Sequence, residues 1–132
     1  MKKITLFLLA VFCLGMIGCS KDAEVEAFIK DFDAVSKEMV AKIDGNPTGA
    51  GIDDAQKAFD AKKVALKEKF GTFKNAREMQ VSKETLTKLT DSITNNGKAI
   101  TDAFSKHATE YEAGDPEKFT KLMKDYTDTF QM

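Results

Sequence analysis

The side chains that can do catalytic or metal-binding chemistry are few in this chain, and their spacing excludes most enzyme classes. The 132 residues contain one histidine, His107, and two cysteines, Cys13 and Cys19. The sequence has no HExxH, CxxC or Gly-x-Ser-x-Gly motif, and the segment 45–51 (GNPTGAG) lacks the Gly-Lys-Ser/Thr ending of a phosphate-binding loop. A di-metal site in a helical bundle takes a Glu-x-x-His motif from each of two helices, which one histidine cannot supply. We therefore expect no enzyme, no metal site and no resident cofactor.

His107 nevertheless has the spacing of an inward-facing residue. It follows Ile100 by seven positions and Ile93 by fourteen, so helical geometry places it along an apolar stripe. A buried histidine and a methionine from another helix can bind haem, and Met39 and Met123 are candidate partners. The alternative is a partly exposed histidine bonded to a backbone group or water, with both methionines filling the core.

The N-terminal residues have the layout of a secretory signal. Lys2 and Lys3 precede an uncharged 15-residue segment, residues 4–18, and charged residues resume at Lys21. A spanning helix needs about 20 apolar residues, so this segment is short for a permanent membrane span. We expect a segment that is cleaved rather than retained.

The small residue Gly18 stands directly before Cys19, at the end of the apolar segment. This pair resembles the bacterial lipobox, although Met16 stands where that motif usually has leucine. The resemblance implies that the Cys19 sulfur receives a diacylglyceryl group, that signal peptidase II cuts between Gly18 and Cys19, and that the new amino group is acylated, for example with palmitate. The alternative is a plain signal peptide with Cys19 as a free thiol.

The expected organisation is a signal peptide, residues 1–18, and a lipid-anchored domain, residues 19–132. Cys13 would leave with the signal and Cys19 would carry lipid, so the mature domain would have no free thiol and no disulfide. By resemblance to enterobacterial sorting, Ser20 after the cysteine favours the outer membrane within the cell envelope, on its periplasmic or surface face.

The charges of the mature chain are balanced and evenly spread. Without Lys2 and Lys3 it has 18 Lys and Arg against 21 Asp and Glu, a net charge of −3 with no basic block, which argues against nucleic acid as a partner. Many acids stand four residues before a base, the favoured order on a helix surface, and are expected to form solvated pairs: Glu26–Lys30, Asp33–Lys37, Glu38–Lys42, Asp53–Lys57, Glu84–Lys88, Asp102–Lys106 and Glu117–Lys121.

Apolar residues recur at steps of three, four and seven, the period of amphipathic helices. This spacing predicts helices over about 22–43, 53–70, 83–111 and 115–130. Ser82 is expected to cap the third helix, and Asp115 to cap the fourth with Pro116 in its first turn. Short connections between such helices predict an all-α fold, an antiparallel four-helix bundle.

Two segments leave alternatives open. Asn95–Gly97 carries a turn signal inside the third helix, but the apolar register continues across it, which favours a continuous helix. Asn96 is either part of a polar pocket, a register-setting residue between helices, or part of a kink. The loop Asn46–Gly51 is either a partner-binding tip or a plain connector.

These features favour a non-enzymatic binding or structural module of the bacterial cell envelope. It would be attached to the membrane through its N-terminal lipid and would bind an envelope protein. The alternative is a carrier that holds haem or another apolar molecule near His107, Met39 and Met123. A third hypothesis is an assembly subunit that completes its core with a second copy.

Overall fold

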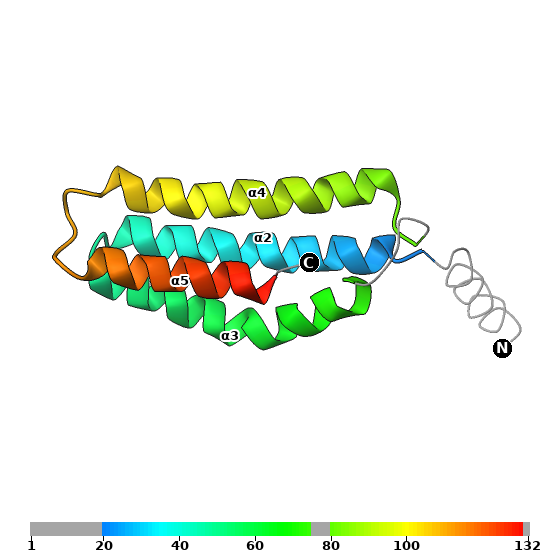
Figure 1. Cartoon of the computed structure of the whole chain (residues 1–132), viewed down its shortest axis with the longest axis horizontal. Coiled ribbons are helices and arrows are strands. Elements are labelled where there is room, and N and C mark those ends of the chain that lie inside the picture. The colour runs from blue at the N-terminus through cyan, green and yellow to red at the C-terminus, as the bar shows by residue number, and fades with distance from the viewer. Residues whose placement is uncertain (1–19, 75–79, 131–132) are drawn as a thin grey trace, which may run out of the picture.

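The computed structural model describes residues 20–74 and 80–130, which fold into four helices. They are α2 (Asp22–Gly45), α3 (Gly49–Phe73), α4 (Lys83–Lys106) and α5 (Asp115–Thr129), and the described residues contain no strand (Figure 1). The predicted all-α four-helix bundle is confirmed. All four helices and their core lie within residues 20–130, so a chain that begins at Ser20 contains every described element of the fold.

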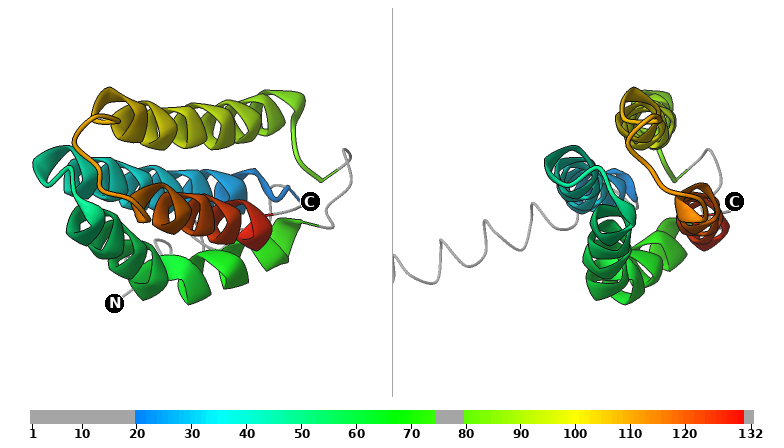
Figure 2. Two further views of the ribbon diagram at one scale, coloured as in Figure 1. Left: turned by 60° about the vertical axis from the view of Figure 1, so that its left-hand side comes forward. Right: turned by 90° about the vertical axis from the view of Figure 1, so that its left-hand side faces the viewer.

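Of the four helices, α2 has the most extensive contacts with the others. Consecutive helices run in opposite directions, and α2 lies between α3 and α4, while α5 lies beside α3 (Figures 1 and 2). The helices α2 and α4 therefore run in the same direction. Their N-terminal ends meet where the Ser82 amide donates to Asp22, and their C-terminal ends meet where His107 bonds Asp44.

Helix α4 is continuous through the turn signal at its centre. It runs unbroken from Lys83 to Lys106, and the Ser82 hydroxyl accepts a hydrogen bond from the Thr85 amide at 3.2 Å, as the sequence predicts for an N-cap. Asn96 lies in the α2–α4 interface, where its amide donates to Asp33 and to Ser92 at 2.5 and 3.1 Å. Asn96 thus joins α4 to α2 through Asp33, and it also lines a polar groove between these helices.

The start of α5 differs from the predicted cap. Gly114, with a φ of +100°, occupies the N-cap position, a left-handed conformation that favours glycine. The prediction that Asp115 caps the helix is wrong, because its carboxylate instead accepts a hydrogen bond from the Glu112 amide at 2.9 Å. Pro116 lies in the first turn as predicted. The neighbouring α4 ends at Lys106, so Tyr111 belongs to the connection between these helices.

A cluster of aromatic rings within the core joins α2, α3 and α5. Phe28 and Phe32 of α2 stack with ring centroids 5.4 Å apart. The centroid of the Phe130 ring lies 5.6 Å from that of Phe28 and 5.0 Å from that of Phe32. The remaining members of this ring cluster are Phe59, Phe70, Phe73 and Tyr126. Aromatic pairs at such separations stabilise a fold beyond the effect of the apolar area that they bury, so this ring cluster helps to hold the three helices together.

Candidate functional site

A groove runs between α4 and α5, which also contact each other through the stacked rings of Phe104 and Phe119, with centroids 4.0 Å apart. The helix α4 packs mainly on α2, and α5 packs mainly on α3. The groove between them has a volume of about 240 Å³. We call it the α4–α5 groove, and it is lined by Phe32, Ile93, Gly97, Met123, Tyr126, Thr127 and Phe130.

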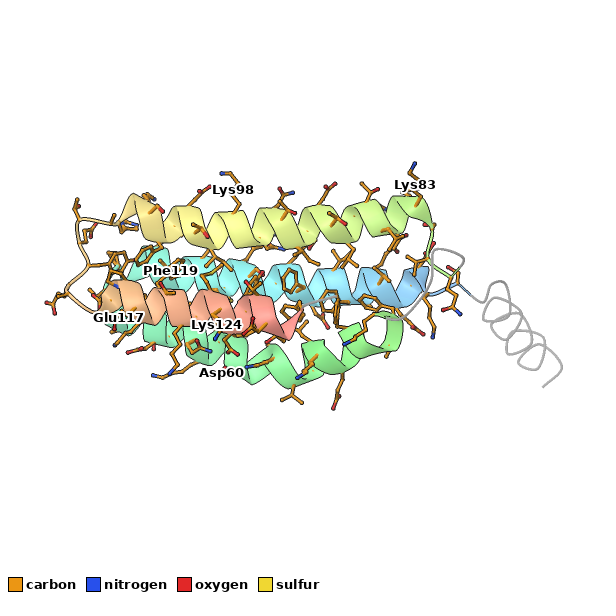
Figure 3. The ribbon with its side chains drawn as sticks, in the orientation of Figure 1. Asp60, Lys83, Lys98, Glu117, Phe119 and Lys124 are labelled. Atoms are coloured by element: carbon orange, nitrogen blue, oxygen red, sulfur yellow. The ribbon has the colours of Figure 1, made fainter. Side chains whose placement is uncertain are left out.

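None of these seven lining residues carries a charge. Three further grooves among the described residues, by contrast, each have three or more charged lining residues. The hydroxyls of the α4–α5 groove are already bonded: Tyr126 shares a hydrogen bond with Ser36 at 3.0 Å, and Thr127 donates to the Met123 carbonyl at 2.8 Å. Lys83 and Lys98 point outward from α4 (Figure 3). The groove is therefore an apolar surface on a chain whose residues are 31% charged.

His107 lies at the end of the bundle where α2 and α4 both terminate, and it is not among the residues that line the groove. Its Nε2 atom is 3.1 Å from Asp44 of α2, its Nδ1 atom is 2.7 Å from Glu110, and its side chain is 15% exposed. A neutral imidazole has one N–H donor, so two carboxylate partners require the protonated ring. Both nitrogens are engaged, which leaves neither free to bind a haem iron.

These contacts predict a raised pKa for His107. The hydrogen bond to Glu110 raises it most, burial of the ring opposes this, Asp44 raises it further and the charge of Lys106 lowers it. We expect the single histidine signal in an NMR titration to give a pKa above the ordinary value of about 6.5. The pKa of His107 is higher in the folded chain than in the unfolded chain. The stabilisation from its contacts with Glu110 and Asp44 is therefore fully present below pH 6.5 and is lost as the pH rises through the folded-state pKa.

The Asp44→Asn variant is the control for that titration, because it removes one carboxylate partner of the ring. Its His107 pKa should move back toward the ordinary value. A pKa at or below 6.5 in the unmodified protein would show that the two contacts do not favour the protonated ring.

The structure does not bring His107, Met39 and Met123 to one site. Met39 is fully buried in the core, and Met123 is partly buried and lines the α4–α5 groove. The predicted lipidation and cleavage residues, Cys19 and Gly18, lie outside the described residues. Met123 is therefore the predicted residue that contributes to the groove.

The start of α2 is joined by hydrogen bonds to the residues that directly precede α4. The Lys21 amide donates to the Gln80 carbonyl at 2.7 Å, and the Ser82 amide donates to the Asp22 carboxylate at 2.7 Å. The Ser82 amide also lowers the pKa of Asp22. Lys21 and Asp22, which follow the first described residue, are thus joined by hydrogen bonds to the segment that leads into α4.

Residues 20–74 and 80–130 contain neither a membrane-spanning helix nor a cluster of metal-binding side chains. No helix there combines the length and apolar character that crossing a membrane needs, and no group of three or more His, Cys, Asp or Glu side chains is arranged to hold a metal ion. Comparison of the chain with protein-family models, with curated proteins and with solved structures finds no match.

Proposed function

We propose that this chain is a lipid-anchored, non-enzymatic binding module of the bacterial cell envelope, with the α4–α5 groove as its binding surface. The observation that carries the proposal is the absence of charge in the lining of that groove, on a chain rich in charged residues. Burial of such a lining against an apolar group is favourable because it removes apolar area from water. The partner is a component of the envelope that offers such a group.

The attachment proposed for this module is the lipid on Cys19, after removal of residues 1–18. The described fold begins at Ser20, and α2 begins at Asp22, so no long tether separates the bundle from the anchor. Phe32, in the floor of the groove, lies ten residues along α2, or about 15 Å from its start. The groove would therefore be held close to the bilayer, with the outer membrane favoured by Ser20.

The lipid attachment is tested by the mass of the mature N-terminus and by incorporation of labelled palmitate. The unmodified protein should begin at Cys19, carry the mass of the diacylglyceryl and acyl groups and fractionate with membranes. The Cys19→Ser variant should retain residues 1–18 and incorporate no palmitate, because serine has no thiol to modify.

Cys13→Ser is the matched control, since it removes the other cysteine from inside the apolar segment. This control should be cut and lipidated like the unmodified protein. A mature chain that begins at another residue and has no added mass would show that the segment is a plain signal peptide, and the anchored part of the proposal would fail.

Haem is not the ligand that we propose, because both ring nitrogens of His107 already bond carboxylates. If the chain carries an apolar molecule, we propose that the molecule binds in the α4–α5 groove and not near His107. Met123 and three aromatic rings form part of the lining of this groove.

A further inference from the structure

We propose that the outer face of α3 binds a second copy of this chain, with the two α3 helices antiparallel across a two-fold axis. The inference goes beyond the proposed function, because it concerns a different surface: no residue of α3 lines the α4–α5 groove. Three observations carry it, namely the exposed apolar centre of this face, the opposite charges at its two ends and the spacing between them.

The surface is the stripe of α3 that lies opposite to its buried side. Its four members follow one another at steps of four, three and four residues, so they share one side of the helix. We call them the outer stripe: Lys57, Ala61, Val64 and Glu68, all of them exposed. At 3.6 residues per turn they lie about half a revolution from the buried residues of α3, which include Ala55, Phe59, Leu66 and Phe70. Figure 1 shows α3 at the edge of the bundle, with its middle bowed away from the other helices.

Val64 gives the outer stripe an apolar centre. Its side chain is 68% exposed, and within residues 20–74 and 80–130 it is the only large apolar side chain that is exposed. Ala61 beside it presents only a methyl group, so the axis of another helix can come close to α3 at this point. Burial of Val64 against the Ala61 methyl of a second copy removes apolar area from water, which favours association.

The two ends of the outer stripe carry opposite charges. Lys57 lies four residues before Ala61, and Glu68 lies four residues after Val64. The Lys57 side chain is 77% exposed, and its ion pair with Asp54, at 3.4 Å, lies within its own helix. Both charges therefore remain accessible to a partner, and the stripe becomes its own electrostatic complement when it is reversed.

The spacing decides how two outer stripes fit together. In an antiparallel pair, the register that sets Ala61 opposite Val64 of the second copy also sets Lys57 opposite Glu68 of the second copy. The two-fold axis repeats each contact, so the pair has two apolar contacts and two ion pairs. A parallel pair would instead set each lysine against a lysine and each glutamate against a glutamate, which repel each other. The charges therefore favour the antiparallel arrangement of two identical chains.

The dimer is expected to be weak in solution. The outer stripe spans about three turns of one helix, which offers less area than the roughly 1,200–2,000 Å² that stable interfaces bury. Attachment to a membrane, as proposed through Cys19, would raise the effective concentration of one copy near another. The antiparallel arrangement puts the starts of the two α2 helices at opposite ends of the dimer, so both anchors reach one bilayer when the bundles lie along it.

The test is sedimentation equilibrium of the chain from Ser20 to Met132, from micromolar to millimolar concentration. We expect an equilibrium between monomer and dimer. Lys57→Glu and Glu68→Lys should each weaken the association at least ten-fold, because the two-fold axis turns two attractive pairs into two repulsive pairs.

An equal mixture of these two variants distinguishes the proposed pairing from damage to the fold. In the mixed dimer, position 57 of each chain faces the opposite charge at position 68 of the other, so association should return to nearly the strength of the unmodified chain. The matched control is Lys98→Glu, the same change of charge on the outward side of α4 (Figure 3). This control should associate like the unmodified chain.

Four results would overturn the inference. They are an unmodified chain that stays monomeric throughout, variants of the outer stripe that associate like the unmodified chain, a mixture that associates no better than either variant alone, and a Lys98→Glu chain that is weakened as much as Lys57→Glu. None of these results bears on lipidation at Cys19 or on the α4–α5 groove, so this inference and the proposed function can fail independently.

Discussion

Replacement of Phe28 by alanine is expected to lower the free energy of unfolding by about 3–5 kcal/mol, the range for a buried phenylalanine truncated to alanine. The Phe28 side chain is fully buried, and its ring lies 5.4–5.6 Å from the rings of four others, Phe32, Phe70, Phe73 and Phe130. These partners come from α2, from α3 and from the residue after α5, so removal of the ring leaves a cavity that no single helix can close by a small shift. Urea unfolding of the Ser20–Met132 chain, followed by circular dichroism, measures the change.

The matched control for this variant is Val64→Ala on α3. Val64 is a large apolar side chain that is 68% exposed, so its truncation should change stability by no more than about 0.5 kcal/mol. A Phe28→Ala variant as stable as Val64→Ala would show that the ring cluster does not hold the three helices together.

Local spacing was enough to predict the helices and most of the core. The apolar positions of the first helix recur every three or four residues, and Val25, Phe32 and Ile43 are all fully buried in the structure. The same holds for Phe59 and Leu122 in the second and fourth helices. Such positions are predictable because a helix that buries one face must repeat apolar residues at its own period.

The neighbours of each helix could not be read from the same spacing. Asp33 was expected to pair with Lys37 on the surface of its own helix, but its carboxylate accepts hydrogen bonds from Ser92 and Asn96 of α4. Periodicity shows which face of a helix is buried, whereas the helix that covers this face depends on how the four helices pack together. The position of His107 against Asp44 has the same origin, because it follows from the parallel placement of α2 and α4.

The α4–α5 groove was only partly visible in the sequence for a related reason. Met123 was identified as a candidate ligand-binding residue, and Gly97 as a turn signal within a helix. Neither observation indicated a groove, because the groove depends on the packing of α4 mainly on α2 and of α5 mainly on α3. A glycine inside an otherwise continuous helix was the one local sign of it, since such a residue weakens the helix without a turn to justify it.

Gly51→Ala is expected to lower the free energy of unfolding by about 2–3 kcal/mol, near the upper end of the range for an overpacked site. Gly51 is buried in the first turn of α3, and a Cβ there would lie 1.8 Å from the carbonyl oxygen of Asn46. That oxygen belongs to the backbone and already accepts a hydrogen bond from the Thr48 amide at 2.8 Å. It cannot rotate away as a flexible side chain would, so the α2–α3 connection has to move, and thermal unfolding should report a lower midpoint.

Alanine substitutions at Gly97 and Gly71 are the matched controls for Gly51→Ala. At Gly97 and Gly71 a Cβ would meet nothing within 4 Å, and both lie in helices, so their alanine variants should be more stable by about 0.5–1 kcal/mol. The same chemical change is therefore expected to have opposite signs at Gly51 and at these two positions. If Gly51→Ala were as stable as the others, the connection at Asn46–Thr48 would be free to shift, and this loop would be the plain connector that its sequence also allowed. If the signs differ as expected, the glycine at 51 is required by the close approach of α3 to the end of α2, and the loop is a fixed part of the fold.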